Sequence, residues 1–268
     1  MNPSILTREN GAAIAYHHSP GLSSPAGHPP TDGHPPGILF CGGFKSDMTG
    51  IKATTLQSFC DAREQQYTRF DYQGHGASSG EFAAGIIGEW RRDMLAIFDA
   101  VASGPQIVVG SSMGGWMALL LALARPERVK GLVLIAPAAD FTEALLRPNL
   151  SDSAKHQIET EGVWMRPSIY NDGPYPITKA LLDDAKAYQV LNDPIPFDGP
   201  VRVFHGGADE TIPFEHVLRT VAAITSQDIV VSWSKAGDHR LSSPADLDRL
   251  CAAIADLSDA LSTPKSAV

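Results

Sequence analysis

The sequence predicts an α/β protein in which helices cover both faces of a mostly parallel sheet. Short apolar runs, such as residues 106–110 and 129–136, alternate along the chain with longer helical runs. Apolar strands that alternate with helices are typical of parallel sheets buried on both faces. With 268 residues, of which 43% are apolar, the chain is large enough to bury such a core. We therefore expect one domain over residues 1–268.

The strands are predicted from short apolar runs that end at polar or turn-forming residues. Residues 2–17 are expected to add one or two antiparallel strands at a sheet edge. The stretch 19–37, rich in Pro, Gly, Ser and His, is predicted to be a surface loop. The buried strands are then expected at residues 37–41, 66–72, 106–110, 129–136, 201–205 and 229–233.

The helices are predicted from their apolar periodicity. Residues 89–101 carry five apolar side chains at helical spacing, which are Trp90, Met94, Ile97, Phe98 and Val101. Residues 113–125 are apolar nearly all round, which predicts a buried helix. Further helices are expected at residues 47–63 and 214–224. A last helix is expected from Ser243-Pro244, where a capping serine precedes a proline at the first helical position.

One segment departs from this alternation. Residues 140–197 contain short helical pieces, including residues 178–188, but no clear strand. An excursion of this length inside a compact domain is too long for a passive connection. We therefore expect a helical lid insertion at approximately residues 141–198, over the edge of the sheet where its parallel strands end.

The sequence Gly110-Ser111-Ser112-Met113-Gly114 matches the pattern G-x-S-x-G. A predicted strand precedes it and a predicted buried helix follows it, which is the context of the nucleophile elbow in α/β hydrolases. In that turn the central serine takes a strained conformation that exposes its hydroxyl, and the flanking glycines let strand and helix pass closely. Ser112 is therefore the predicted nucleophile.

A serine hydroxyl needs a general base to act as a nucleophile at neutral pH. Downstream of Ser112, Asp209 follows a predicted strand and a Gly-containing turn, and His239 follows the last predicted strand. The order Ser, Asp, His is the order in α/β hydrolases, so we assign Asp209 as the acid and His239 as the base. Asp140, which follows the strand at 129–136, is the alternative acid, and Asp238 is expected to be a structural neighbour of the base.

The other histidines are given structural roles. We expect His75 to shape a loop at the rim of the pocket and His205 to lie in the turn before Asp209. His156 and His216 are predicted to be surface or lid residues. His239 alone stands where the fold delivers a base.

An acyl-transfer intermediate carries an oxyanion that needs two preorganised donors. The backbone N–H of Met113 is one candidate, because it directly follows the nucleophile at a helix N-terminus whose dipole favours negative charge. The second candidate is the N–H of Phe44, in the loop after the strand at 37–41, where Gly42-Gly43 lets the backbone approach. A tight turn without a catalytic donor is the alternative for this loop.

With these residues in view, the chain resembles the mitochondrial α/β hydrolases that act as acyl-protein (S-palmitoyl) thioesterases and acyl-glucuronide esterases. The likeness covers almost the whole chain after the His- and Pro-rich loop. The elbow and triad motifs belong to the whole superfamily, whereas the matches in the lid and at Trp116 are specific to the group. Those specific matches include Gly114-Gly115-Trp116, Gly162-Val163-Trp164 and Pro167-Ser168-Ile169-Tyr170.

The resemblance implies an acyl-enzyme mechanism on esters or thioesters, with Ser112, Asp209 and His239 as the triad and no metal or organic cofactor. The substrate is expected to be a small molecule or an acylated protein. Four lid side chains are expected to line an apolar acyl pocket, although packing beneath the lid would explain them nearly as well; they are Trp164, Met165, Tyr170 and Tyr175. The alternatives are lactone, C–C or peptide cleavage on the same triad, or a non-catalytic ligand-binding protein.

The composition of the chain restricts the classes of binding partner and the cellular compartments that we expect. The net charge of −9 argues against nucleic acid as a principal partner. The three cysteines show no metal-site or disulfide spacing, and their odd number suits a reducing compartment. No signal sequence and no apolar run of about 20 residues is visible, so we expect no membrane span. The N-terminal loop is unlike a targeting peptide, and a cytoplasmic location is expected. Oligomeric state stays open.

Overall fold

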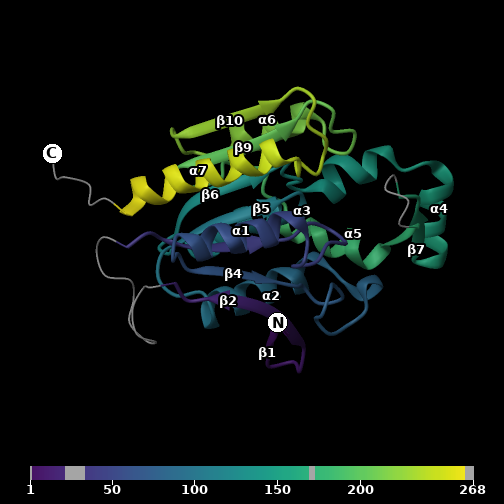
Figure 1. The fold of residues 1–268 in the computed structure, drawn as a ribbon. Helices are drawn as coiled ribbons and strands as arrows, with labels where there is room; N and C mark the ends of the chain where they lie inside the picture. The colour runs from purple at the N-terminus through teal and green to yellow at the C-terminus, as the bar shows by residue number, and fades with distance from the viewer. Residues whose placement is uncertain (1, 22–33, 169–172, 263–268) are drawn as a thin grey trace.

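The computed structural model describes residues 2–21, 34–168 and 173–262. An eight-stranded sheet lies between two layers of helices (Figure 1), which confirms the predicted architecture. The strand order is β1-β2-β4-β3-β5-β6-β9-β10. The pairs β1–β2 and β2–β4 are antiparallel, and every other pair in this sheet is parallel. The N-terminal strands therefore form an antiparallel edge, as predicted.

The strands begin and end close to the predicted positions. Their bounds are β1 Ser4–Thr7, β2 Ala13–Ser19, β3 Gly37–Cys41, β4 Tyr67–Phe70, β5 Gln106–Ser111, β6 Val129–Ile135, β9 Val201–Gly206 and β10 Ile229–Ser234. All five residues of β3 and all six of β5 are buried. These two strands lie side by side near the middle of the sheet, where helices cover both faces.

The helices that cover the sheet are α1 Ile51–Ala62, α2 Ile87–Ala100, α3 Met113–Ala124, α6 Phe214–Ala223 and α7 Pro244–Ser262. Helix α1 begins four residues later than predicted. The cause is local: the side chain of Asp47 accepts the N–H of Thr49 at 2.7 Å, which forms a turn in place of a helical start. Gly50 then caps the helix.

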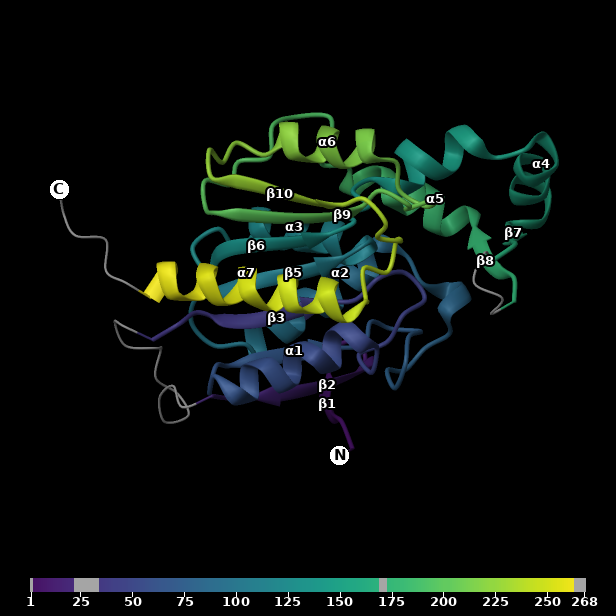
Figure 2. The same ribbon diagram turned by 45° about the horizontal axis from the view of Figure 1, so that its top comes forward.

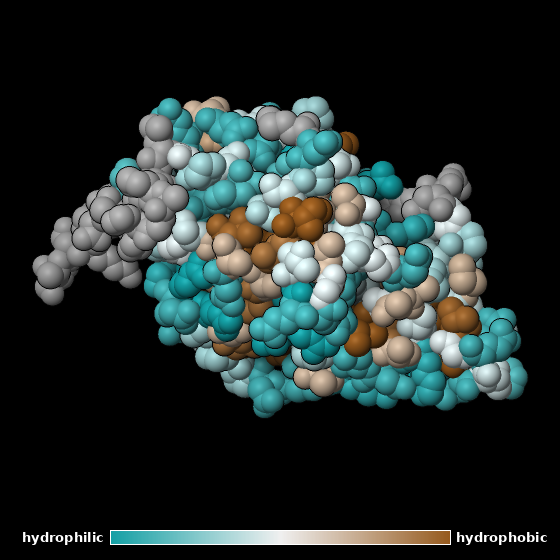
Figure 3. Space-filling view, turned by 90° about the horizontal axis from the view of Figure 1, so that it is seen from below, coloured by the Kyte–Doolittle hydropathy of each residue, from teal (hydrophilic) through white to brown (hydrophobic). Residues whose placement is uncertain are grey.

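Two clusters of buried apolar side chains lie between the sheet and the helices, one on each face of the sheet. Helices α1 and α7 pack on one face of the sheet, and α2, α3 and α6 pack on the other (Figure 2). Helix α3 is buried from Met113 to Ala122, as its uniform apolarity predicts. Trp90, Met94 and Ile97 of α2 are fully buried on its predicted apolar face. Seen from the β1 side (Figure 3), polar residues cover most of the surface and apolar residues gather in separate groups.

The segment between β6 and β9 is more varied than predicted. It contains a π-helical turn Thr142–Leu146, a 3-10 turn Arg147–Asn149, α4 Asp152–Glu161, β7 Val163–Arg166, β8 Tyr175–Thr178, α5 Lys179–Ala185 and a 3-10 turn Lys186–Tyr188. Outside this segment, a further 3-10 turn, Phe82–Ala84, lies between β4 and α2. The helical stretch at 178–188 is confirmed. The expectation of no strand is wrong, because β7 and β8 form an antiparallel hairpin. Each is only four residues long, so neither leaves a clear alternating pattern.

We call residues 136–200 the insertion. In Figure 2 it lies at one end of the sheet, beyond the ends of the parallel strands. The assignment of residues 1–268 to one domain with a lid at about 141–198 stays a prediction. No helix among the described residues combines the length and apolarity needed to span a membrane.

Candidate active site

Ser112 lies in the sharp turn between β5 and α3. Its φ of 55° is in the left-handed region, which is unusual for a residue with a side chain. Its N–H donates to the carbonyl of Ile135 at 2.8 Å, which holds the turn against β6. A Cβ atom at Gly110 would overlap the backbone of Gly114, and one at Gly114 would overlap the carbonyl of Cys41. The two motif glycines are therefore required for strand and helix to approach this closely.

The structure brings the three predicted triad side chains together. His239 Nε2 lies 3.1 Å from Ser112 Oγ, and His239 Nδ1 lies 2.8 Å from Asp209 Oδ2. The second carboxylate oxygen of Asp209 accepts the N–H groups of Thr211 and Ile212 at 2.8 and 2.9 Å. The Asp209 side chain is fully buried, while the His239 side chain is 14% exposed. The imidazole therefore joins a fixed carboxylate to an accessible hydroxyl.

Asp209 stays ionised in this environment. Burial alone would raise the pKa of a carboxyl group, but the hydrogen bond and charge of His239 oppose it, as do the two backbone N–H donors. The net result is a pKa of Asp209 below its ordinary value. An ionised carboxylate in this position keeps the proton of the neutral imidazole on Nδ1 and leaves Nε2 free to accept the Ser112 proton.

Asp140, the alternative candidate for the triad acid, has a structural role instead. Asp140 is buried at the start of the insertion, and its carboxylate accepts the N–H groups of Val190 and Leu191 at 2.8–3.0 Å. It therefore ties the far end of the insertion to the end of β6. Asp238 accepts the N–H of Leu241 at 2.9 Å, which shapes the turn after the base, as expected of a structural neighbour.

The two predicted oxyanion donors lie beside Ser112. Met113 is the first residue of α3, and Gly43 approaches so closely that a Cβ there would lie 3.4 Å from Ser112 Cβ. Phe44 follows Gly43 directly. Across residues 2–21, 34–168 and 173–262, no hydrogen-bond acceptor is found for the N–H of Phe44 or of Met113. Both donors are therefore available to a ligand oxygen.

A cavity of about 800 Å³ opens onto Ser112 and His239. Trp164 and Tyr175 line it, as predicted. The prediction for Met165 is wrong: alternate residues of β7 point to opposite faces, so Trp164 faces the cavity and Met165 is 49% exposed on the outside. Tyr170 lies outside the described residues.

Several lining residues were missed from the sequence. The start of the insertion supplies an apolar wall of Phe141, Leu145, Leu146 and Leu150, and Ile212 adds to it. The spacing of these leucines is helical, which was the available signal. Phe44 lines the same cavity, and its ring contacts the rings of Phe82, Trp90, Phe141 and Tyr175 at 4.9–5.8 Å between centroids.

Cations outnumber carboxylates in the lining of the cavity, although the chain carries a net charge of −9. The cationic residues are Lys45, Lys52, Arg166 and Arg240, and the carboxylates are Asp47 and Glu210. Lys52 Nζ donates to the backbone carbonyl of Arg240 at 2.5 Å. Arg240 is the residue that directly follows His239. Burial, partly offset by Asp238, lowers the pKa of Lys52 to about 8. Among the described residues, no group of three or more His, Cys, Asp or Glu could hold a metal ion.

Two other histidines lie differently from the expectation. His205 belongs to β9 rather than to the following turn, and its ring stacks on Phe214. His216 is 6% exposed on the inner face of α6, so its assignment to the surface or lid is wrong. Burial lowers the pKa of each. The burial of these two residues was not predictable from their residue type, because histidine occurs at both buried and exposed positions.

Comparison with known proteins places this site in a family. Residues 38–166 match the family model described as serine aminopeptidase, S33. The chain is 43% identical over 232 residues to the palmitoyl-protein thioesterase ABHD10, mitochondrial, of Mus musculus, covering 86% of this chain and 78% of that protein. The Homo sapiens protein of the same name is 38% identical over 97% of this chain and 81% of its own length. The chain belongs to the ABHD10 family of α/β hydrolases.

Solved structures agree with this placement. The structure of alpha/beta hydrolase domain-containing protein 10 from mouse superimposes with a TM-score of 0.87 at 39% identity, covering 97% of this chain and all of that one. A putative hydrolase from Agrobacterium vitis S4 superimposes with a TM-score of 0.86 at 34% identity, covering 96% and 98%. The ABHD10 fold therefore extends over nearly the whole chain.

The expected cytoplasmic location is contradicted by this comparison. The similar proteins of mouse, rat and cattle are all named as mitochondrial. The expectation used the free cysteines and the N-terminal composition. Free thiols indicate a reducing environment without saying which compartment provides it.

Proposed function

We propose that this ABHD10-family chain is a serine hydrolase that cleaves acyl thioesters and esters through an acyl-enzyme on Ser112. The observation that carries the proposal is the hydrogen-bonded series Ser112–His239–Asp209, whose Ser112 and His239 line a cavity with an apolar wall. The names of its relatives, palmitoyl-protein thioesterases, support an acyl substrate. A small-molecule ester and an acylated protein both remain within this substrate class.

Each step follows from the geometry. His239 Nε2 removes the proton from Ser112 Oγ as the oxygen attacks the acyl carbonyl. The N–H groups of Met113 and Phe44 hold the oxyanion. When this intermediate collapses, the bond to the thiol or alcohol breaks and His239 returns the proton to the leaving group. A water then attacks the acyl-enzyme by the same route and releases the acid.

The wall of the cavity suggests where the acyl chain lies. Phe141, Leu145, Leu150 and Trp164 form an apolar side that excludes water from an alkyl chain. Most of that wall belongs to the insertion, which therefore acts as a lid over the acyl chain. Each buried CH₂ group contributes about 0.8 kcal/mol, so a longer chain is expected to bind more tightly until it fills the cavity.

Peptide cleavage is the second candidate, because the matching family model is described as a serine aminopeptidase. An aminopeptidase must bind a cationic N-terminus, but cations outnumber carboxylates in the cavity lining: Lys45, Lys52, Arg166 and Arg240 against Asp47 and Glu210. A panel of p-nitrophenyl esters, S-acyl cysteine thioesters, lactones and aminoacyl anilides separates these functions. We expect turnover of thioesters at least equal to that of matched esters; preferred turnover of anilides would contradict the proposal.

A matched pair of variants tests the acyl pocket. Trp164→Ala removes a ring that faces the cavity, and we expect it to lower kcat/KM for long acyl chains about tenfold relative to acetyl substrates. Met165→Ala changes the next residue of β7, on the outer face, and is expected to leave the chain-length profile unchanged. Equal effects of the two variants would place the acyl chain elsewhere.

A further inference from the structure

In the loop after β3, hydrogen bonds hold two consecutive peptide groups in place. The first joins Gly43 to Phe44: the carbonyl of Gly43 accepts the N–H of Ser46 at 3.2 Å and the hydroxyl of Ser46 at 3.0 Å. In a trans peptide the C=O and N–H groups point in opposite directions. Fixing the Gly43 carbonyl therefore also fixes the direction of the Phe44 N–H, which lies beside Ser112.

The second peptide group joins Phe44 to Lys45. The N–H of Lys45 donates to His75 Nε2 at 3.2 Å, and His75 comes from the loop after β4. Lys45 has a φ of 60°, a conformation that a residue with a side chain keeps only when its surroundings hold it there. His75 is 4% exposed, so its ring supplies a partner that is shielded from water.

The hydrogen bonds of His75 define its protonation. Its Nδ1 lies 3.1 Å from the carbonyl oxygen of Gln73, which can only accept, so Nδ1 carries a proton. Nε2 must then be unprotonated to accept the N–H of Lys45. Both bonds exist together only in the neutral imidazole. Burial lowers the pKa of His75, which favours that neutral form.

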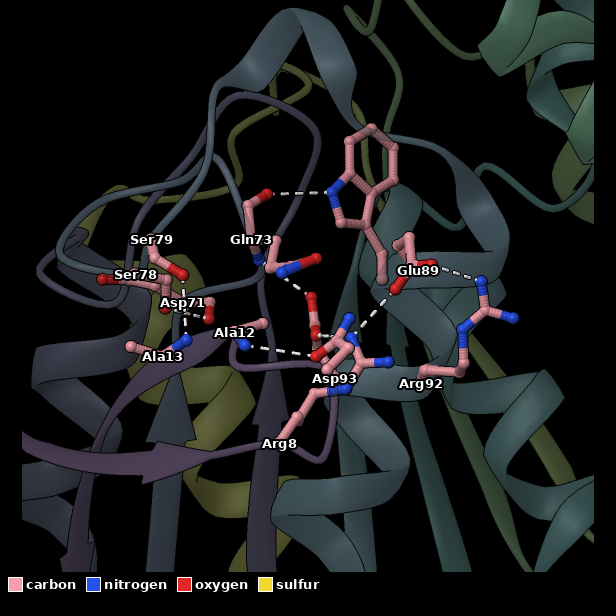
Figure 4. Close-up of polar contacts among 12 residues, drawn as sticks. Arg8, Ala12, Ala13, Asp71, Gln73, Ser78, Ser79, Glu89, Arg92 and Asp93 are labelled. Carbon is pink, nitrogen blue, oxygen red and sulfur yellow. Dashed lines mark hydrogen bonds and ion pairs between the residues drawn. The ribbon is translucent and has the colours of Figure 1, made fainter.

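Gln73, whose carbonyl accepts the Nδ1 proton of His75, is itself held by buried residues. The N–H of Gln73 donates to Asp93 Oδ2 at 2.8 Å, and its carbonyl also accepts the indole N–H of Trp90 at 3.0 Å. Asp93 is fully buried in α2 and is paired with Arg8 at 2.6 Å. Figure 4 shows Gln73, Asp93 and Arg8 as one connected series. The acceptor for Lys45 is thus held by α2 and by the N-terminal edge of the sheet.

We propose that His75 is a positioning residue for the oxyanion hole: by accepting the Lys45 N–H, it holds the Phe44 peptide in the orientation that stabilises the transition state. This inference rests on the proposed function, because it takes Phe44 as an oxyanion donor. His75 does not touch the substrate; it acts through the backbone of Lys45.

Two substitutions at His75 separate positioning from packing. His75→Phe keeps an aromatic ring against Tyr72, Phe82 and Trp90 but removes the acceptor. His75→Gln supplies an amide oxygen that can accept the Lys45 N–H. A displaced donor lowers transition-state stabilisation while ground-state binding is kept. We therefore expect His75→Phe to lower kcat on p-nitrophenyl butyrate about tenfold to hundredfold with KM within about twofold, and His75→Gln to recover most of the loss.

Ser46→Ala provides a second test that does not depend on a buried site, because Ser46 is exposed. It removes one of the two donors to the Gly43 carbonyl, and we expect kcat to fall about threefold to tenfold. A trifluoromethyl ketone, whose tetrahedral adduct places an oxygen in the hole, should lose affinity in parallel with kcat in both variants.

The outcomes are distinguishable from a failure of the proposed function. If the wild-type rate depends on Ser112 while His75→Phe and Ser46→Ala keep wild-type kcat, the inference is overturned and the hydrolase proposal stands. A loss in His75→Phe that His75→Gln does not reduce, or that appears only in KM, also overturns it. A wild-type rate that persists in Ser112→Ala overturns the proposed function and this inference together.

Discussion

Ser112→Ala is expected to lower kcat on esters and thioesters by a factor of about 10⁵–10⁶ while the protein keeps its fold. The substitution removes the oxygen that lies 3.1 Å from His239 Nε2 and leaves every backbone contact of the turn in place. Hydrolysis of p-nitrophenyl butyrate, measured beside thermal unfolding, checks both parts. Labelling by a fluorophosphonate probe should disappear with the activity.

The neighbouring serine supplies the matched control. Ser111→Ala makes the same chemical change at the last residue of β5, where the hydroxyl is not bonded to the imidazole. We expect its kcat to stay within about tenfold of wild type. If Ser111→Ala lost activity and Ser112→Ala kept it, the assignment of the nucleophile would be wrong.

Asp209→Asn is expected to lower kcat by a factor of about 10⁴. The amide fills nearly the same space, so the fold and the position of His239 are retained. An amide is neutral, however, and can donate to Nδ1, which stabilises the tautomer whose proton lies on Nε2 and cannot accept from Ser112. Steady-state kinetics at pH 7–8 with p-nitrophenyl butyrate measures the effect.

Asp140→Asn is the control for that substitution. Its amide oxygen can still accept one of the N–H groups of Val190 and Leu191, so we expect a modest loss of thermal stability and a kcat within about tenfold of wild type. A larger loss of kcat in Asp140→Asn than in Asp209→Asn would transfer the acid role to the end of β6.

The site was more predictable than its surroundings because it depends on connectivity. Ser112, Asp209 and His239 each follow a parallel strand, and such strands end at the same edge of a sheet. The order of elements along the chain therefore predicts which side chains meet. The turn at Ser112 was also predictable, since Gly110 and Gly114 are needed for local steric reasons that the sequence displays.

The insertion was harder to predict, because its structure depends on contacts with distant residues. Each strand of the hairpin β7–β8 has only four residues, and β8 contains Pro176. Proline is uncommon inside strands, so the sequence of β8 does not resemble a typical strand. The contrast between Trp164 and Met165 appears only once that hairpin is known. The role of His75 depends on Lys45, 30 residues earlier in the chain, and no local spacing reveals such a pair.

The central claim is that the reaction passes through an acyl group on Ser112. Mass spectrometry of acid-quenched enzyme, taken during the first turnovers of a p-nitrophenyl ester, tests it most directly. We predict one acyl adduct, on the peptide that contains Ser112, which forms with the release of p-nitrophenol and decays at the rate of turnover. An adduct on another residue, or turnover at the full rate in enzyme whose Ser112 is already blocked by a fluorophosphonate, would contradict the account.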